Sequence, residues 1–431
     1  MQLYNHQQEI IDKNPFYTGL WLGCGSGKTR IALALATGKT LVICLKTQRD
    51  DKNWQTELLK MNKTLDLTVI SDDDFLRIHK DIGYYDTVIV DEATKCLGVS
   101  TNDKFVKKVR TVKSSKRFEY LVALIEKKKP DRVYLVTATV TKTPLCIWAS
   151  GVILGKWSMD TFWRFRDKFY FELPMQKRVP IYSAKKTPEL KEELINLSKS
   201  MGYTGRLEDW NDVPKQTYKD EYLELTNEQK ALIKDLHLEY PDPATLNLKR
   251  NQIENGILKG DKFGYTPTLE VKDKKIPRLL DYAVEFPQMV VFAKFTKQIE
   301  KIENALKKKG YEVYLLTGKT KDRGEMLNTI RSKKEYILIV QTGISKGWEL
   351  KNCPIIIFAS RDHKWEDYNQ ALGRIQRGDN IKKNLYINLM VKYDHIVSGK
   401  GGQNIDKGSM DIAIGKSLSE GEDFNDKLYA K

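Results

Sequence analysis

The stretch "WLGCGSGKTR", residues 21–30, places three glycines between two apolar runs and follows the last of them with a lysine and a threonine. The residues at its start, 20–22, have the apolar character of a buried strand. The residues that follow it, "IALAL" at 31–35, have the apolar character of a buried helix. Glycines let backbone N–H groups converge on an anion, and the start of a helix favours negative charge. The stretch therefore predicts a strand, a phosphate-binding loop and a helix, in that order.

The core of this loop, "GSGKT" at residues 25–29, matches the second half of the nucleotide-binding P-loop pattern. The complete pattern requires a glycine where the chain has Leu22, and a glycine-rich helix start without a ligand is the structural alternative. In such loops the lysine neutralises the β- and γ-phosphates, and the hydroxyl that follows it holds Mg²⁺. The predicted nucleotide-binding residues are Gly25, Ser26, Gly27, Lys28 and Thr29, and Thr29 is also a predicted metal ligand.

A pair of carboxylates follows a second buried run in "VIVDEAT", residues 88–94. Asp91 and Glu92 should lie at the carboxyl end of a strand, where ligands bind in open parallel sheets. We predict that Asp91 holds Mg²⁺ and that Glu92 orients or deprotonates the attacking water. Such a pair often only caps a helix, but downstream of a P-loop it indicates a hydrolase.

The segment "NQALGRIQRG", residues 369–378, carries two arginines and a glutamine at helical spacing. The spacing predicts one face of a helix that Gly378 ends. The residues of this face are Gln370, Gly373, Arg374 and Arg377. They fit a clamp on the γ-phosphate if the helix faces the P-loop across a cleft, and the alternative is a salt-bridged surface face.

Short β-branched runs alternate with helical patterns in two parts of the chain, which predicts an α/β fold with two parallel sheets covered by helices. The predicted strands of the first part are 40–45, 66–71, 86–91 and 133–139, with helices over 29–37 and 53–61. Those of the second part are 289–295, 311–318, 336–343, 354–360 and 385–390, with a helix over 296–310.

The sequence between the two parts has a different pattern, because aromatic and basic residues alternate there with polar helical segments. We predict a first domain over 1–152, a mainly helical connector over 153–272, a second domain over 273–400 and a loosely ordered tail over 401–431. Within the connector, the aromatics of "FWRFRDKFYF", residues 162–171, could stack on bases. The helical spacing of Phe162, Phe165 and Phe169 favours a core stripe instead.

The chain has a strong excess of positive charge, +16 over 431 residues, which favours a polyanionic partner such as nucleic acid. Solvated lysine-rich faces without function are the alternative. No apolar run approaches the roughly 18 residues of a membrane span. We therefore expect no membrane partner and a cytoplasmic location. The five cysteines are dispersed, so neither a zinc site nor a disulfide framework is indicated.

In their order, these motifs resemble those of superfamily 2 helicases and translocases, a resemblance that implies two RecA-like domains, ATP and Mg²⁺. "LYNHQQEII", residues 3–11, is similar to the adenine-reading segment and implies that Gln7 contacts the base. "TAT" is similar to motif III, which implies that Thr137 and Thr139 couple hydrolysis to domain movement. "QALGRIQR" is similar to motif VI, which implies that Arg374 and Arg377 are arginine fingers.

Within that superfamily the resemblance is strongest to the SWI/SNF-type translocases and covers residues 3–395. "KTQRDDKNWQTEL" looks like their motif Ia region, and "QTGISKGWEL" looks like motif V, which implies that Gly347 and Glu349 lie near the nucleotide. Glu349 stands where Asp or Asn is commoner. The large insertions of chromatin remodellers are absent, so the size suits a compact viral or bacterial DNA motor, similar to phage branch-migration helicases.

The resemblance also implies that each RecA-like domain holds a nucleic-acid backbone through residues at the ends of strands. The candidates are Lys46, Thr47, Ser71, Thr317, Gly318, Thr342 and Lys346. A further basic segment, "KFVKKVRTVKSSKR" at residues 104–117, is compatible with an extended or hairpin element that touches the duplex or separates strands. A solvated basic loop is the alternative reading of this segment.

The leading hypothesis is an ATP-driven DNA helicase or double-strand DNA translocase, a monomer by family default, acting on single-stranded, duplex or branched DNA. An RNA helicase is the close alternative. Two hypotheses come from other classes: a P-loop phosphotransferase indifferent to nucleic acid, and a nucleic-acid-binding module with a vestigial site. The intact Lys28, Asp91, Glu92, Arg374 and Arg377 argue against the vestigial site.

Overall fold

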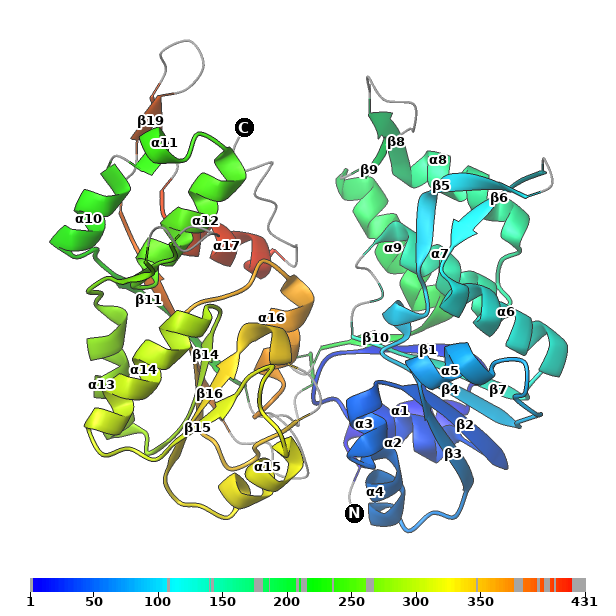
Figure 1. Cartoon of the computed structure of the whole chain (residues 1–431). Helices are drawn as coiled ribbons and strands as arrows, with labels where there is room; N and C mark the ends of the chain where they lie inside the picture. The colour runs from blue at the N-terminus through cyan, green and yellow to red at the C-terminus, as the bar shows by residue number, and fades with distance from the viewer. Residues whose placement is uncertain are drawn as a thin grey trace. The chain divides into compact units, whose positions relative to one another are not determined.

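The computed structural model divides the chain into two compact units, Met1–Val213 and Pro214–Lys431 (Figure 1). It describes residues 3–106, 109–138, 140, 143–173, 181–185, 187–206, 209–210, 215–234, 236–260, 267–345, 348–375, 383–393, 396–398, 404–406 and 408–420. Among the helices of these ranges, none combines the length and the apolar character needed to cross a membrane.

The first unit is built on a sheet of six parallel strands in the order β10-β1-β7-β4-β2-β3. Its strands are β1 (Tyr17–Leu22), β2 (Lys39–Cys44), β3 (Asp66–Ser71), β4 (Thr87–Asp91), β7 (Arg132–Val136) and β10 (Gly202–Gly205). The inner strands are largely buried and mostly apolar because helices cover both faces of the sheet. Ile89 and Val90, successive residues of β4, accordingly contribute to opposite cores.

Two sets of helices cover this sheet. One core is closed by α1 (Asn5–Lys13), α2 (Lys28–Leu35) and α4 (Asn53–Lys60). The other is closed by α5 (Asp72–Ile78), α6 (Lys116–Lys128), α7 (Pro144–Ile153), α8 (Phe162–Phe169) and α9 (Pro188–Met201). The short helix α3 (Lys46–Asp50) follows β2, and two antiparallel hairpins complete the unit: β5 (Val99–Val106) with β6 (Val109–Ser114), and β8 (Tyr170–Leu173) with β9 (Ile181–Ala184).

The second unit repeats the plan with six parallel strands in the order β11-β18-β17-β14-β16-β15. The strands are β11 (Thr217–Leu223), β14 (Gln288–Ala293), β15 (Val313–Leu316), β16 (Tyr336–Gln341), β17 (Ile355–Phe358) and β18 (Leu385–Val391). Val290 and Val291 of β14 again enter opposite cores. The α/β class with two parallel sheets is thus confirmed.

Helices cover both faces of this second sheet and one end of it. One core is closed by α13 (Lys275–Glu285) and α14 (Thr296–Lys308), and the other by α15 (Arg323–Arg331) and α16 (Trp365–Leu372). A smaller core lies among α10 (Asn227–Lys234), α11 (Leu236–Glu239) and α12 (Pro243–Glu254). Two short hairpins, β12 (Ile257–Leu258) with β13 (Leu269–Glu270) and β19 (Ile396–Ser398) with β20 (Asn404–Asp406), and the helix α17 (Met410–Ser419) complete the unit.

The segment predicted as a mainly helical connector, 153–272, differs from that expectation. The division between the units falls inside it, and it supplies an edge strand to each sheet, β10 to the first and β11 to the second. Strand β10 reads "GYTG", without the apolar alternation that marks a strand. It pairs with β1 so closely that a Cβ at Gly202 would lie 2.2 Å from the carbonyl oxygen of Gly19.

The segment 401–431, expected to be a loosely ordered tail, contains the helix α17. Its apolar residues Met410, Ile414 and Leu418 recur every four positions and are buried against Trp365 and Tyr368. This spacing is typical of a helix with one apolar face, and it is visible in the sequence itself. The structure therefore departs from the expectation at residues 408–420.

Two open alternatives are decided by the structure. Phe162 and Phe169 are almost fully buried in the core and Phe165 packs against it, so the predicted core stripe is confirmed. Residues 104–106 and 109–114 of the basic segment 104–117 lie in the paired strands β5 and β6, which agrees with the hairpin form, and Lys116 and Arg117 begin α6. The side chains at 103–110 lie outside the described residues.

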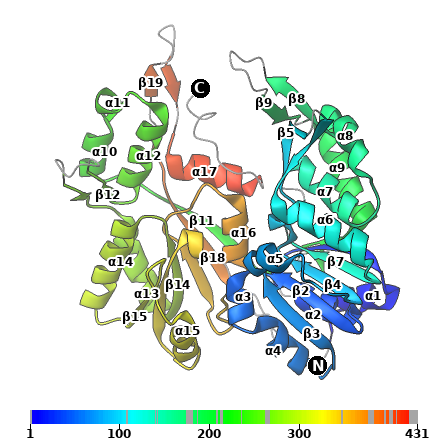
Figure 2. The ribbon, with the colours of Figure 1, turned by 45° about the vertical axis from the view of Figure 1, so that its right-hand side comes forward.

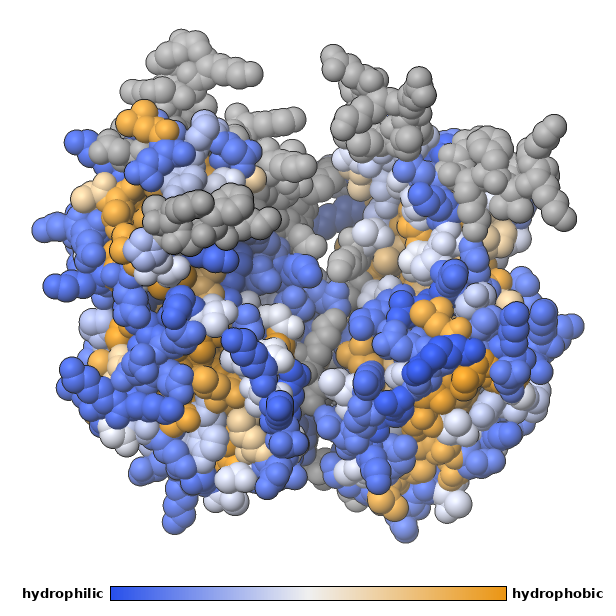
Figure 3. All heavy atoms as spheres, viewed as in Figure 1, coloured by the Kyte–Doolittle hydropathy of each residue, from blue (hydrophilic) through white to orange (hydrophobic). Residues whose placement is uncertain are grey.

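The face of the molecule drawn in Figure 3 is largely hydrophilic, in keeping with the charged composition. Apolar side chains reach the surface of the first unit over β3, where residues 67–70 are only partly buried. This exposure follows from the position of β3 at the edge of its sheet.

Candidate nucleotide-binding site

The predicted phosphate loop connects β1 to α2 and runs over residues 23–27. Gly25 and Gly27 have φ angles of 82° and 79°, in the left-handed region that favours glycine. A Cβ at Gly27 would also lie 2.2 Å from the side-chain nitrogen of Gln7. Backbone conformation and close packing therefore both require glycine at position 27, directly before the first turn of α2.

Three hydrogen bonds hold this loop from outside. His6 Nε2 and Gln7 Nε2 lie 3.0 and 2.9 Å from the carbonyl oxygen of Ser26, and the N–H of Gly23 donates to the carbonyl of Gly205 at 2.8 Å. The Ser26 hydroxyl is buried and donates to the Gly23 carbonyl at 2.8 Å. Ser26, predicted to bind nucleotide, therefore uses its side chain to shape the loop.

The lysine of the loop is held at the end of β1. Lys28 Nζ donates to the carbonyl oxygens of Leu22 and Gly23 at 2.7 and 2.8 Å. Thr29 is half-buried in the first turn of α2, where the helix dipole favours an anion. The ammonium group, the helix N-terminus and the loop N–H groups thus share one location, as a polyphosphate would require.

The two acidic residues lie at the carboxyl end of β4. Asp91 is the last residue of the strand, and Glu92 follows with φ 48°, a left-handed conformation that turns the chain sharply. The backbone N–H of Glu92 donates to Asp91 Oδ1 at 3.0 Å. A non-glycine residue in this conformation is uncommon and occurs often at functional sites.

Strand order brings the motifs of the first unit to one edge of the sheet. Strand β7 lies between β1 and β4, with Val136 opposite both Leu20 and Asp91. Thr137 follows β7 and donates its N–H to the Leu20 carbonyl at 3.2 Å. The phosphate loop, Thr137 and the Asp91–Glu92 pair therefore follow three adjacent parallel strands at their carboxyl ends, where such sheets bind ligands.

The donor set at this edge fits a magnesium ion that is shared with a nucleotide. Thr29, Asp91 and Glu92 offer hydroxyl and carboxylate oxygens, and Mg²⁺ is usually bound through one or two such groups together with substrate phosphates. Among the described residues, no group of three or more His, Cys, Asp or Glu side chains could hold a metal by itself. The site thus suits a metal that arrives with its nucleotide.

Gln7 was expected to read adenine, and the structure assigns it further contacts. It is buried, donates to the Ser26 carbonyl and accepts the backbone N–H of Tyr4 at 3.2 Å. Trp210, which sequence reasoning missed, stacks on His6 with ring centroids 3.6 Å apart. No local pattern marks Trp210, because its stacking partner His6 is about 200 positions away in the chain.

In the second unit, the helix predicted over 369–378 ends earlier. Helix α16 stops at Leu372 with Gly373 as its cap, and the N–H of Arg374 bonds the Ala371 carbonyl at 3.1 Å in a tightened last turn. Glycine is a poor helix residue, which favours termination there. Gln370 is therefore on the helix and Arg374 beyond its end, while Arg377 lies outside the described residues.

Arg374 is buried and binds backbone carbonyls of its own unit. Its Nε donates to Gln370 at 2.9 Å and its Nη1 to Trp348 at 2.8 Å. Its own carbonyl accepts the N–H of Leu350 at 3.0 Å. Arg374 thus joins the end of α16 to residues 348–350, at the end of the predicted motif V.

Comparison with known proteins shows that part of the second unit is similar to a known protein family. Residues 271–379, from just before α13 to just beyond α16, match the model of the helicase conserved C-terminal domain. This part of the second unit is therefore similar to a helicase C-terminal domain.

A curated relative and a solved structure are also similar to the chain. The chain is 27% identical over 142 residues to the ATP-dependent RNA helicase DBP3 of Yarrowia lipolytica. This match covers 31% of this chain and 26% of the relative. The chain thus spans about a quarter of the length of that relative. The Hef helicase domain of Pyrococcus furiosus has a TM-score of 0.49 and 13% identity, over 90% of this chain and 95% of that one.

The predicted backbone-binding residues of the second unit follow its strands. Thr317 and the exposed Gly318 come directly after β15, and Gly318 has open space at its Cα. Thr342 follows β16 and is 8% exposed. Glu349 is half-buried, with its carboxylate 3.6 Å from Lys351 Nζ. Gly347 and Lys346 lie outside the described residues, as does Thr139 of the first unit.

In the first unit the corresponding residues differ in exposure. Lys46 and Thr47 are exposed at the start of α3, immediately after β2. Ser71 is 1% exposed, and its hydroxyl caps α5 by accepting the Asp74 N–H at 3.0 Å. Ser71 therefore has a structural role here, whereas Lys46 and Thr47 remain accessible to a ligand.

Proposed function

We propose that the protein is an ATP-dependent helicase or double-strand DNA translocase of superfamily 2, in which hydrolysis moves two RecA-like domains along DNA. The observation that carries the proposal is the alignment of the phosphate loop, Thr137 and the Asp91–Glu92 pair on three adjacent strands of the first unit. The similarity of the second unit to a helicase C-terminal domain supports it.

In the proposed mechanism the first unit binds the triphosphate. The loop N–H groups and the N-terminus of α2 hold its oxygens, and Lys28 turns from the Leu22 and Gly23 carbonyls to the β- and γ-phosphates. Mg²⁺, held by Thr29 and Asp91, would neutralise developing charge on the phosphates. Glu92 orients a water molecule and accepts its proton as the water oxygen bonds to the γ-phosphorus. The bond from the γ-phosphorus to the bridging oxygen breaks at the same time, and ADP leaves with that oxygen.

The second unit is proposed to complete the site with its arginines. Arg374 is committed to the carbonyls of Gln370 and Trp348, so we assign it to supporting the segment that carries the finger. Arg377 is then the residue that contacts the γ-phosphate. In this proposal Gln370 and the motif V residues Gly347 and Glu349 also lie near the γ-phosphate. Thr137 and Thr139 couple ATP hydrolysis to movement of the domains.

The nucleic acid along which the protein moves is proposed to be DNA. The net charge of +16 and the resemblance to SWI/SNF-type and phage branch-migration enzymes support it, with a compact viral or bacterial motor in the cytoplasm as the setting. An ATP-dependent RNA helicase is the second candidate, favoured by the similarity to an RNA helicase. A P-loop phosphotransferase would hydrolyse ATP at a rate that nucleic acid does not change.

One experiment separates these candidates. ATP hydrolysis is measured without nucleic acid and with single-stranded DNA, duplex DNA, forked DNA and RNA, each beside the Glu92→Gln variant. We expect stimulation by DNA that the variant abolishes. Stimulation by RNA alone would select the second candidate, and hydrolysis indifferent to every nucleic acid would exclude both motors.

A further inference from the structure

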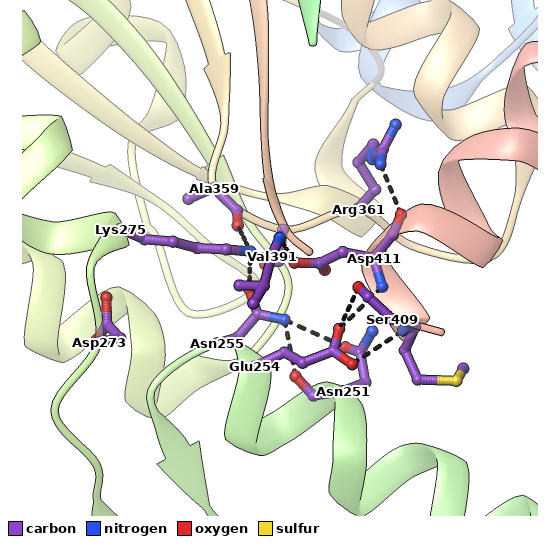
Figure 4. A network of polar contacts seen from close by, with 12 residues as sticks. Asn251, Glu254, Asn255, Asp273, Lys275, Ala359, Arg361, Val391, Ser409 and Asp411 are labelled. Carbon is purple, nitrogen blue, oxygen red and sulfur yellow. Dashed lines mark hydrogen bonds and ion pairs between the residues drawn. The ribbon is translucent and has the colours of Figure 1, made fainter. Parts of the chain in front are cut away.

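Helix α17 is anchored to the second unit by a buried carboxylate at its first turn. Glu254, at the end of α12, accepts the N–H groups of Met410 and Asp411 at 2.8 and 2.9 Å and the Ser409 hydroxyl at 3.2 Å (Figure 4). It also accepts the Tyr393 hydroxyl at 2.7 Å. These orphan N–H groups of a helix start are thus satisfied by one side chain.

A buried ion pair fixes the same end of α17 to the sheet. Lys275 Nζ and Asp411 Oδ2 lie 2.6 Å apart, and their side chains are 2% and 5% exposed. Lys275 also donates to the carbonyl of Ala359, just beyond β17, at 2.7 Å, and Asp411 accepts the N–H of Val391 in β18 at 3.2 Å. Removing one member of such a pair costs several kcal/mol, so the N-terminus of α17 is firmly placed.

From this anchor α17 packs along α16, the helix that leads to Gln370 and Arg374. Its residues Met410, Ile414 and Leu418 contact Trp365 and Tyr368, and the two helices lie side by side in Figures 1 and 2. The chain thus returns, after β18, to support the helix that carries the predicted motif VI.

Arg361 lies between the two helices. Its Nη2 donates to the Asp411 carbonyl at 2.8 Å, and a Cβ on Gly415 would lie 2.5 Å from the same nitrogen. Glycine is unfavourable inside a helix relative to alanine, and at position 415 it makes room for the guanidinium. On its other side Arg361 lines a small cavity together with Thr342 of motif V and Tyr368 of α16.

We propose that Arg361, seated on α17 through Asp411 and Gly415, is a positioning residue for α16 and motif V. The proposal rests on the proposed function, because it assumes that the end of α16 presents arginines to ATP bound elsewhere. ATP bound by the first unit does not contact Arg361 in this scheme. Displacing Arg361 should therefore slow ATP turnover and leave ATP affinity nearly unchanged.

Gly415→Ala tests this with a single methyl group. The substitution raises helix propensity, so α17 should remain folded while the methyl displaces the guanidinium. The matched control is Gly324→Ala, in the helix α15 of the same unit, where a Cβ meets nothing within 4 Å. The second test variant is Arg361→Lys, which keeps the charge but loses the planar fork that reaches both helices.

Nucleic-acid-stimulated kcat and KM for ATP are measured for each variant, together with amide hydrogen exchange over residues 365–372. We expect roughly a tenfold lower kcat, an unchanged KM and faster exchange in Gly415→Ala and Arg361→Lys, with Gly324→Ala like the parent. A parental kcat in both test variants, or an equal rise in KM, overturns the inference. If the parent protein hydrolyses no ATP, the proposed function fails, and the exchange of α16 still decides whether Arg361 positions it.

Discussion

The indole ring of Trp210 stacks on the imidazole ring of His6, 3.6 Å from centroid to centroid, and His6 Nε2 lies 3.0 Å from the carbonyl oxygen of Ser26 in the phosphate loop. The loop is also bonded to the end of β10 through Gly23 and Gly205. The conformation of the phosphate loop therefore depends on a segment that the chain reaches only at the end of the first unit.

Trp210→Ala should weaken ATP binding, because His6 loses the ring that holds it against the loop. An aromatic stack contributes about 0.5–1.5 kcal/mol, so Kd for ATP should rise about two- to tenfold, measured with a fluorescent ATP analogue. Trp210→Phe keeps a stacking ring and serves as the control, with a smaller change. Parental affinity in Trp210→Ala would show that the stack does not support the loop.

Glu92→Gln should retain ATP binding and lose turnover. The amide can still accept a hydrogen bond from water but cannot take its proton, and general-base catalysis is worth roughly 10²–10⁴-fold. Single-turnover hydrolysis measures the loss. Glu126→Gln, at an exposed position of α6 in the same unit, is the matched control. A loss of less than about tenfold would remove Glu92 from the role of base.

Cys24 should be the cysteine that reacts with a thiol reagent in the folded protein. It is partly exposed within the phosphate loop, whereas the other four cysteines are buried. Burial raises the pKa of Cys96 and of Cys353 to about 12, which suppresses the reactive thiolate. Mass spectrometry after brief alkylation should find one modified residue, and ATP should slow the reaction. Labelling that ATP leaves unchanged would argue against nucleotide at this loop.

The second unit should lose stability in acid through Glu221. Burial alone would raise the pKa of this carboxyl, but hydrogen bonds from Arg278, Tyr282 and Lys219 outweigh it and hold the pKa at about 2. Because this folded pKa is below the unfolded value of 4.5, the stabilisation is present above pH 4.5 and is lost as the pH falls toward 2.

Urea unfolding at pH 7 and pH 3 checks this for the parent and Glu221→Gln. Between pH 7 and pH 3, the free energy of unfolding of the parent should fall by on the order of 2 kcal/mol more than that of the variant, allowing for solvent screening. The control is Glu285→Gln, at an exposed position in α13 of the same unit. Equal acid sensitivity in the parent and Glu221→Gln would contradict the assignment.

The basic segment 104–117 should contribute to the salt dependence of DNA binding. Each lysine that neutralises a phosphate adds about 0.9 to the slope of log K against log salt concentration. Replacing Lys104, Lys107 and Lys108 with alanine should therefore flatten the slope, measured by fluorescence anisotropy between low and moderate salt. An unchanged slope would mean that the hairpin does not touch the backbone.

The inner strands and the phosphate loop were predictable because their signals are local. Strand β3 has the predicted bounds, 66–71, and Asp91 ends β4 as expected. Runs of β-branched residues mark strands that are buried on both faces, and glycines before a lysine mark a loop that must approach an anion. Both patterns depend on neighbours within a few positions, so no tertiary information is needed to read them.

The edge strands and the details of motif VI were not predictable in the same way. Strand β10 contains two glycines and is a strand because it pairs with β1, more than 180 positions away. The spacing of Arg374 suggested a helix face, but Gly373 ends α16 and the guanidinium binds carbonyls at Gln370 and Trp348. These outcomes depend on partners that the local pattern does not contain.

The sequence alone was sufficient for the α/β class and the order of the motifs, since chain order and residue chemistry carry this information directly, and the residues that it assigns to phosphate, metal and water remain predictions. The tertiary structure decided which residues support that chemistry. Ser71 became a helix cap, Trp210 came to stack on a residue that holds the phosphate loop, and residues 410–419 became a helix packed against α16. The physical reason is that buried hydrogen bonds, ion pairs and ring contacts join residues distant in sequence, and folding alone selects which of them meet.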